Sequence, residues 1–206
     1  MEVHLLDAVR ITLPPDANVV VVDSDADEQY TVVDTDQADG SRQAVEHLLG
    51  LGHETVWHVA GPDGSFAAQR RAAAWAETLR SHGRPVPRML HGDWSSASGY
   101  QAGLALPDEC TAVFAANDQM ALGILRALRE RRIAARQHVS VVGFDDVPGA
   151  ASYCPPLTTI HQDFAQVGRR CVDKALRQIE GHGPEAGRTL VPTSLVVRDS
   201  TAPPAG

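Results

Sequence analysis

The hydrophobic positions of the chain form short apolar runs that alternate with longer stretches in which apolar residues recur at helical spacing. The runs predict strands at residues 19–22, 31–33, 56–61, 89–91, 113–115, 139–143 and 194–197. Helical spacing and capping residues predict helices at residues 5–11, 39–49, 67–81, 95–106, 120–131 and 164–180. The run Val19–Val22 is entirely β-branched, which is typical of a strand buried on both faces.

Strands that alternate with helices predict an α/β fold with parallel, doubly wound sheets and right-handed crossovers. The segment 113–163 is the most informative part: a strand, the polar turn Asn117-Asp118, an amphipathic helix, and a second strand that ends in Asp145-Asp146. Because the two strands run in the same direction, both polar turns lie at one edge of the sheet. Open α/β sheets bind small ligands at this edge.

Composition narrows the class of protein. The chain has 206 residues, of which 43% are hydrophobic and 21% charged, as in ordinary globular proteins. A net charge of −8 repels phosphate backbones, so we expect no nucleic-acid binding by this chain alone. The three cysteines form no CxxC pair, and we expect no metal and no cofactor. Without a signal-peptide pattern or an apolar run near the ~20 residues that span a bilayer, we expect a cytoplasmic protein with no membrane contact.

Polar and aromatic side chains follow the predicted strands, where a sugar would need carboxylates, amides, a guanidinium and an aromatic face. The candidate ligand-binding residues are Asp23, Arg71, Trp94, Asn117, Asp145, Gln162 and Phe164. For Asp118 we favour a helix N-cap, and for Asp146 a role in holding the turn. Trp94 lies in a polar Gly-Asp-Trp-Ser turn and favours stacking on a ligand. Phe164 begins a helix, and a role in the core remains an alternative.

The sequence does not favour an enzyme. Asp145 and Asp146 are adjacent, so their side chains diverge instead of flanking one bond. The nine histidines form no His-Glu-x-x-His motif, and no serine lies in a Gly-x-Ser-x-Gly elbow. A sugar hydrolase or isomerase stays an alternative that an assay of glycoside turnover tests.

Three blocks of sequence resemble the effector-binding core of the lac repressor family of bacterial transcription regulators. They are residues 116–121 (ANDQMA), 140–146 (SVVGFDD) and 155–160 (PPLTTI). The resemblance implies a two-lobed, periplasmic-binding-protein-like fold with the ligand between the lobes. Residues 1–35 and 164–191 would form the N-terminal lobe, residues 36–163 and 192–201 the C-terminal lobe, and residues 202–206 a tail.

The resemblance also implies roles for the candidate residues. Arg71 matches the Arg of an R-x-x-G-[FW] motif, although Ala74 replaces its Gly, and Asn117 and Asp145 match groups that bind sugar hydroxyls. The other four match residues found more narrowly, in lac-repressor-like members. These matches imply that the effector is a sugar, a galactoside or another glycoside.

Members of this family begin with a helix-turn-helix headpiece, and no such pattern precedes Val19. We therefore expect an incomplete first lobe, and contact with operator DNA only through the missing headpiece. The resemblance implies a homodimer to which the helix at 120–131 contributes, unless its leucines pack only on their own sheet. A periplasmic-type sugar-binding protein of a transporter is the alternative function, opposed by the lack of a signal peptide and by a repressor-like ending at residues 190–201.

Overall fold

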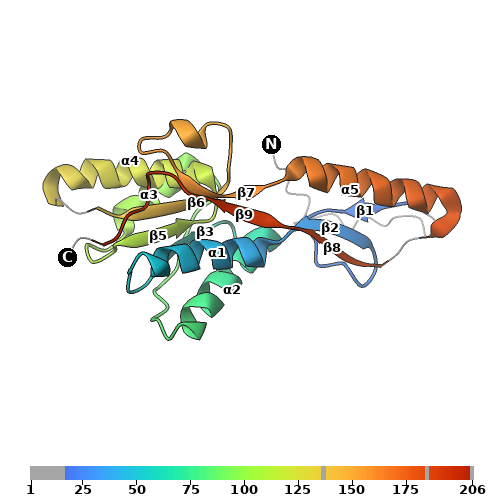
Figure 1. Ribbon diagram of the computed structural model, residues 1–206, viewed down its shortest axis with the longest axis horizontal. Helices are drawn as coiled ribbons and strands as arrows, with labels where there is room; N and C mark the ends of the chain where they lie inside the picture. The colour runs from blue at the N-terminus through green and yellow to red at the C-terminus, as the bar shows by residue number, and fades with distance from the viewer. Residues whose placement is uncertain (1–16, 136–137, 184–185, 205–206) are drawn as a thin grey trace.

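The strands of the protein form two separate sheets (Figure 1), in a computed structural model that describes residues 17–135, 138–183 and 186–204. The larger sheet has the order β4-β3-β5-β6-β7-β9, and every neighbouring pair is parallel except β7 and β9. Its strands are β3 (Trp57–Ala60), β4 (Leu90–His91), β5 (Ala112–Ala115), β6 (Ser140–Asp145), β7 (Thr158–Gln162) and β9 (Thr193–Val196). The smaller, wholly parallel sheet contains β1 (Val20–Val21), β2 (Thr31–Thr35) and β8 (Gly187–Val191).

Helices cover both faces of the six-stranded sheet. On one face, α1 (Gln37–Gly50) and α2 (Phe66–Ser81) pack around Phe114 and Phe144. On the other, α3 (Ser96–Ala105) and α4 (Asp118–Ala135) pack around Met120 and Ile124. A 3-10 turn at Ala150–Ser152 follows β6. Sheet and helices therefore confirm the predicted doubly wound α/β fold.

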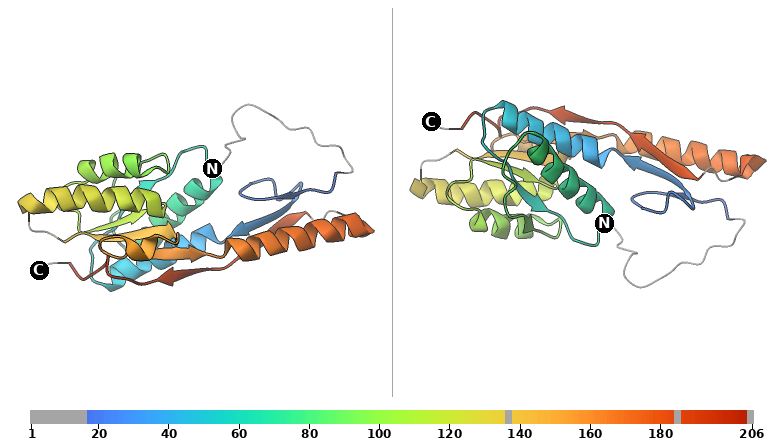
Figure 2. Two further views of the ribbon diagram at one scale, coloured as in Figure 1. Left: turned by 90° about the horizontal axis from the view of Figure 1, so that it is seen from above. Right: turned by 90° about the horizontal axis from the view of Figure 1, so that it is seen from below.

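The three-stranded sheet has a thinner core. The long helix α5 (Phe164–Arg177), which continues as a π-helical turn at Gln178–His182, lies beside this sheet (Figure 2). Val33, Val167 and Val191 form its small apolar cluster. In α5 Val167 is buried, whereas Val172 and Leu176 are exposed, as is Ile179 of the π-helical turn.

Each α-helix begins with a polar side chain that accepts a hydrogen bond from a backbone N–H three residues on. The capping residues are Asp36, Ser65, Ser95, Asn117 and Asp163. Such caps stabilise a helix because its first N–H groups have no partner within the helix. The local sequence therefore determines where each helix starts, close to the carboxyl ends of the strands.

Two predictions about the smaller sheet need correction. The strand predicted at Val19–Val22 is only Val20–Val21, its residues are half-buried, and Val22 is 50% exposed. Among the described residues β1 pairs only with β2, so it is an edge strand and not a strand buried on both faces. Strand β8 was not predicted, because its sequence, Gly-Arg-Thr-Leu-Val, has no apolar run. The helix predicted at residues 5–11 lies outside the described residues.

The chain passes between the two sheets after β2, after β7 and after β8, and these crossing segments are hydrogen-bonded to one another. The Asp36 N–H donates to the Val191 carbonyl (2.8 Å), and the Thr193 hydroxyl donates to the Asp36 carbonyl (3.3 Å). The Thr35 hydroxyl donates to Gln162 Oε1. The carboxyl ends of the smaller sheet thereby face those of the larger one.

Candidate ligand-binding site

A cavity of about 500 Å³ lies where the two sheets face each other, within the size range of small-ligand pockets. Side chains from both sheets and from α2 and α5 line it. All seven residues that the sequence singled out are among them: Asp23, Arg71, Trp94, Asn117, Asp145, Gln162 and Phe164. The structure thus brings together residues up to 141 positions apart (164 − 23).

Arg71 is buried at the floor of the cavity, in the first half of α2. Its Nε donates to Gln37 Oε1 (2.7 Å), and its Nη1 donates to the Ala116 carbonyl. Its Nη2 lies 3.8 Å from Asp145 Oδ1. The guanidinium carbon also lies 3.8 Å from the centre of the Phe144 ring, a cation–π contact. These contacts hold the guanidinium in one orientation beside the Asp145 carboxylate.

Asp145 and Gln162 form the next part of the site, at the ends of neighbouring strands. Gln162 Nε2 donates to Asp145 Oδ1 (2.7 Å), and Gln162 Oε1 accepts from Thr35 and from Gln37 Nε2 (3.2 Å). These bonds leave an arrangement of carboxylate, amide and guanidinium groups that can both accept from and donate to ligand hydroxyls.

Trp94 and Asn117 are linked across the cavity wall. Asn117 Nδ2 donates to the Trp94 carbonyl (3.0 Å), while Asn117 Oδ1 accepts from the Met120 N–H (2.8 Å) and caps α4. The six-membered ring of Trp94 lies against Gly61, where a Cβ would come within 2.3 Å of the Trp94 ring. Gly61 therefore sets how deeply the Trp94 ring can lie.

The expected cap at Asp118 is wrong, because Asn117 fills that role. Asp118 is the first helical residue, and its carboxylate accepts from the Thr159 hydroxyl (2.5 Å) and the Val147 N–H (2.9 Å). Burial raises the pKa of Asp118 to about 7. Asp118 therefore ties α4 to β7 and to the segment after β6, and it does not line the cavity.

The backbone at this edge is strained. Among the described residues, the non-glycine positions with positive φ are Asp23 (50°), Trp94 (72°), Asp145 (119°) and Asp146 (55°). Such conformations are uncommon for residues with a Cβ and concentrate at functional sites. The first three line the cavity, whereas Asp146 accepts from Arg198 (2.7 Å) and lies 3.1 Å from His161, as expected of a residue that holds the turn.

Phe164 is 60% exposed and lines the cavity, so its alternative role as a core residue is excluded. Asp23, after β1, also lines the cavity, with its Oδ1 3.7 Å from Arg70 Nη1. The Phe164 ring and the Asp23 carboxylate together suit a ligand with one apolar face and several hydroxyls.

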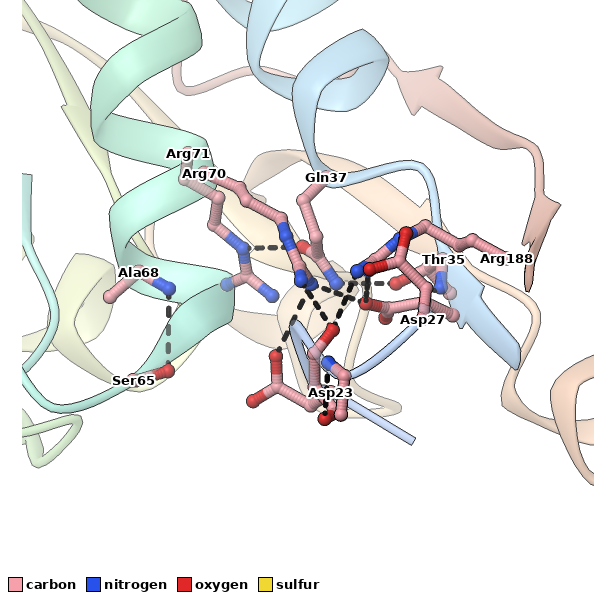
Figure 3. Close-up of polar contacts among 12 residues, drawn as sticks. Asp23, Asp27, Thr35, Gln37, Ser65, Ala68, Arg70, Arg71 and Arg188 are labelled. Carbon is pink, nitrogen blue, oxygen red and sulfur yellow. Dashed lines mark hydrogen bonds and ion pairs between the residues drawn. The ribbon is translucent and has the colours of Figure 1, made fainter. Parts of the chain in front are cut away.

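Several residues of the cavity wall were not predicted from the sequence, and the most important of them is Asp34 in β2. Asp34 is buried, and its Oδ2 accepts from Arg70 Nη1 (2.5 Å) and Arg188 Nη1 (3.3 Å). Both arginines also donate to the Ser24 carbonyl, at 2.6 and 2.7 Å. Figure 3 shows Arg70 and Arg188 converging from opposite sides on the loop between β1 and β2, to which Ser24 belongs. The feature of the sequence that could have identified Asp34 is its place beside the carboxyl end of a strand, β2. The other missed wall residues are Val22, Thr35, Gln37, Ala67, Asp93, Gln119 and Val167.

Two negative findings concern the described residues alone. No three or more His, Cys, Asp or Glu side chains among them are grouped so as to hold a metal ion. No helix among them is long and apolar enough to cross a membrane.

Comparison with known proteins agrees with this architecture. Residues 45–201 match the model of a periplasmic binding protein-like domain. The lactose operon repressor of Escherichia coli strain K12 is 42% identical over 170 residues, which are 81% of this chain and 47% of that protein. The transcriptional regulator CelR of Thermobifida fusca is 35% identical over 179 residues, 84% of this chain and 53% of the relative.

Solved structures agree as well. A dimeric lac repressor with an 11-residue C-terminal deletion superposes with a TM-score of 0.82 and 37% identity, covering 90% of this chain and 69% of that one. A complex of CelR with cellobiose has a TM-score of 0.79 and 34% identity, covering 84% and 55%. The chain therefore belongs to the lac repressor family and carries its periplasmic binding protein-like domain. It spans about half the length of the curated relatives it matches.

Proposed function

We propose that this chain is the effector-binding part of a lac-repressor-type transcription regulator, and that it binds a sugar or glycoside in the cavity between its sheets. The observation that carries the proposal is the cavity itself. The seven candidate residues present carboxylates, amides, a guanidinium and aromatic faces to one cavity. Relatives of the same family are described in complex with cellobiose and with ribose, which supports a carbohydrate effector.

We further propose that the two sheets belong to two lobes that move relative to each other. Residues 1–35 with 164–191 would form the N-terminal lobe, residues 36–163 with 192–201 the C-terminal lobe, and residues 202–206 a tail. A ligand that contacts Asp23 and Phe164 from one lobe and Arg71 and Asp145 from the other binds one lobe arrangement better than another. Only such a difference in affinity shifts the population of the two arrangements.

In the intact regulator this shift would alter operator binding by a DNA-binding headpiece, in the cytoplasm and as a homodimer. Dimeric structures of lac repressors support the homodimer. In α4, Leu125 and Leu128 are buried against their own sheet, whereas Leu122 is 40% exposed. Of the three leucines, Leu122 is therefore the one that remains for a dimer contact. The ligand would be bound without being converted, because the relatives are named as regulators.

Thermal and chemical unfolding across a panel of galactosides, glucosides and free sugars tests the proposal. A ligand at 100 times its Kd raises the free energy of unfolding by about 2.7 kcal/mol. We expect this shift with at least one glycoside, and its loss in Asp145→Asn, because Asp145 lies at the centre of the hydrogen-bonded group. Asp108→Asn removes the same charge from an exposed ion pair with Arg131 outside the cavity and should keep the shift. A cooperative unfolding transition with no shift for any sugar would contradict the proposal.

A further inference from the structure

The wall that the smaller sheet contributes to the cavity is acidic. Asp23 and Asp34 both line it, and Asp93 and Asp145 face it from the larger sheet. Of the described residues that line the cavity, only Arg71 is a lysine or arginine. Four carboxylates therefore line a volume that Arg71 also lines, while Arg70 and Arg188, which are not part of the lining, pair with Asp34. Even with these two counted, four carboxylates stand against three guanidinium groups.

The guanidinium of Arg71 is already engaged by the protein. It donates to Gln37 and to the Ala116 carbonyl, approaches Asp145 and stacks on Phe144. An acidic ligand would have to compete with Asp145 for this group. Arg71 thus neutralises a carboxylate of the protein and adds no net positive charge to the cavity.

Asp34 is positioned so that one of its oxygens can accept a further hydrogen bond. The two guanidinium contacts, from Arg70 and Arg188, both fall on Oδ2. Oδ1 accepts from the Thr35 N–H (2.8 Å), and a carboxylate oxygen can accept two hydrogen bonds. Burial raises the pKa of Asp34 above its ordinary value, although Arg70 and Arg188 act in the opposite direction.

Asp23 adds a second acceptor to the same wall. Its Oδ1 is buried and has no hydrogen-bond partner among the described residues, although Arg70 lies 3.7 Å away. Asp93, on the opposite wall, is held in its charged form, because hydrogen bonds from Ser95 lower its pKa. The wall therefore offers acceptors for hydroxyl or ammonium donors and places like charges against any anion.

We propose that the cavity selects neutral or amino sugars over acidic ones, with Asp34 and Asp23 as specificity-determining acceptors. The excluded class comprises uronates and sugar phosphates. This inference rests on the proposed function, namely that the cavity binds a carbohydrate at all.

Titration calorimetry at pH 7.5 and low ionic strength, where charge effects are least screened, tests the inference with matched ligands. In both the galacto and gluco series the probes are the methyl glycoside, the 2-amino sugar, the uronate and the 6-phosphate. We expect the neutral or amino member of one series to bind, with the uronate and the phosphate at least about ten-fold weaker, since like charges brought together in a binding site oppose association. In Asp34→Asn and in Asp23→Asn this ratio should shrink several-fold.

Asp108→Asn removes one charge outside the cavity and should leave the ratio unchanged. Asp23, with 40% of its side chain exposed, provides a second test should Asp34→Asn fail to fold. An acidic sugar that binds as tightly as its neutral counterpart, or a ratio that neither substitution alters, would overturn the inference and leave the proposed function standing. Absence of binding by every probe to the folded wild type would overturn both.

Discussion

Single side chains in this protein are held by contacts that their neighbours in sequence do not supply. His58 is the clearest case. It is fully buried in β3, and its ring stacks on Phe114 at 4.8 Å between centroids. Its Nδ1 lies 2.9 Å from the Phe114 carbonyl, which can only accept, so Nδ1 carries the proton. Its Nε2 has no hydrogen-bond partner among the described residues. The ring is therefore neutral at neutral pH.

This neutrality predicts acid sensitivity. Burial lowers the pKa of His58 from 6.5 to about 4. The unfolded chain takes up a proton near pH 6.5 and the folded chain does not, so the free energy of unfolding falls as the pH decreases from about 6.5 towards 4. The fall in the free energy of unfolding that His58 causes over this range is on the order of 3 kcal/mol. Urea unfolding at a series of pH values measures it, and His58→Gln should flatten this part of the profile.

Burial also lowers the pKa values of His53 and His47, so both residues reduce the free energy of unfolding in acid as His58 does. The test is therefore the difference between the pH profiles of wild type and His58→Gln. His91→Gln is the matched control, because His91 is half exposed beside Asp63. Identical pH profiles for wild type and His58→Gln would contradict the predicted role of His58.

Among the helices, α3 and α4 pack backbone against backbone at two glycines. A Cβ at Gly123 would lie 2.0 Å from the Ser96 carbonyl oxygen, and one at Gly99 would lie 2.2 Å from the Met120 carbonyl oxygen. Glycine at these positions lets the two backbones touch. This contact also fixes the start of α3, which Trp94 precedes, relative to the start of α4, which Asn117 caps.

Gly123→Ala should therefore destabilise the protein by on the order of 3 kcal/mol, because backbone must move to admit the methyl group. Gly168→Ala, in α5, is the control. A Cβ there meets nothing within 4 Å, and the change should stabilise the protein by about 0.5–1 kcal/mol through helix propensity. Denaturant titrations of both variants measure the two effects. A Gly123→Ala protein as stable as wild type would show that the helices can separate without cost.

At the scale of the whole molecule, Arg70 connects the units built on the two sheets. It lies on α2, beside the larger sheet, and donates to Asp34 and to the Ser24 carbonyl of the smaller one. We expect these hydrogen bonds of Arg70 to keep the two sheets facing each other when no ligand is bound. Loss of the bridge would leave Asp34 with Arg188 as its remaining guanidinium partner.

We expect Arg70→Leu to lower the free energy of unfolding by about 2 kcal/mol, as for hydrogen bonds to charged groups. We also expect a larger radius of gyration for the ligand-free chain in small-angle scattering, because the sheets can separate. Arg126→Leu removes an arginine whose ion pair with Glu130 lies within α4 and is exposed, so neither quantity should change measurably. An unchanged radius together with unchanged stability in Arg70→Leu would show that the crossing segments alone hold the sheets together.

Local sequence patterns were enough to predict the α/β class, the order of most elements and the edge at which a ligand would bind. Strand runs, helix caps and the polar turns after strands are local features, and a single segment such as 113–163 contains all of them. The seven candidate residues were found in this way, together with the family resemblance, and the structure brings all seven to one cavity. Whether each contacts a ligand stays a prediction.

The remaining features could not be predicted in this way, because they depend on contacts between residues that are distant in the chain. Strand β8 is a strand because β2, about 150 residues earlier, pairs with it, and its own sequence has no such pattern. Asp34 joins the cavity wall because Arg70 and Arg188 meet it there. The choice between Asn117 and Asp118 as the cap of α4 depended on Thr159 and Val147, which hold the Asp118 carboxylate. Local sequence cannot encode these partners, because the contacts that select them exist only after the chain has folded.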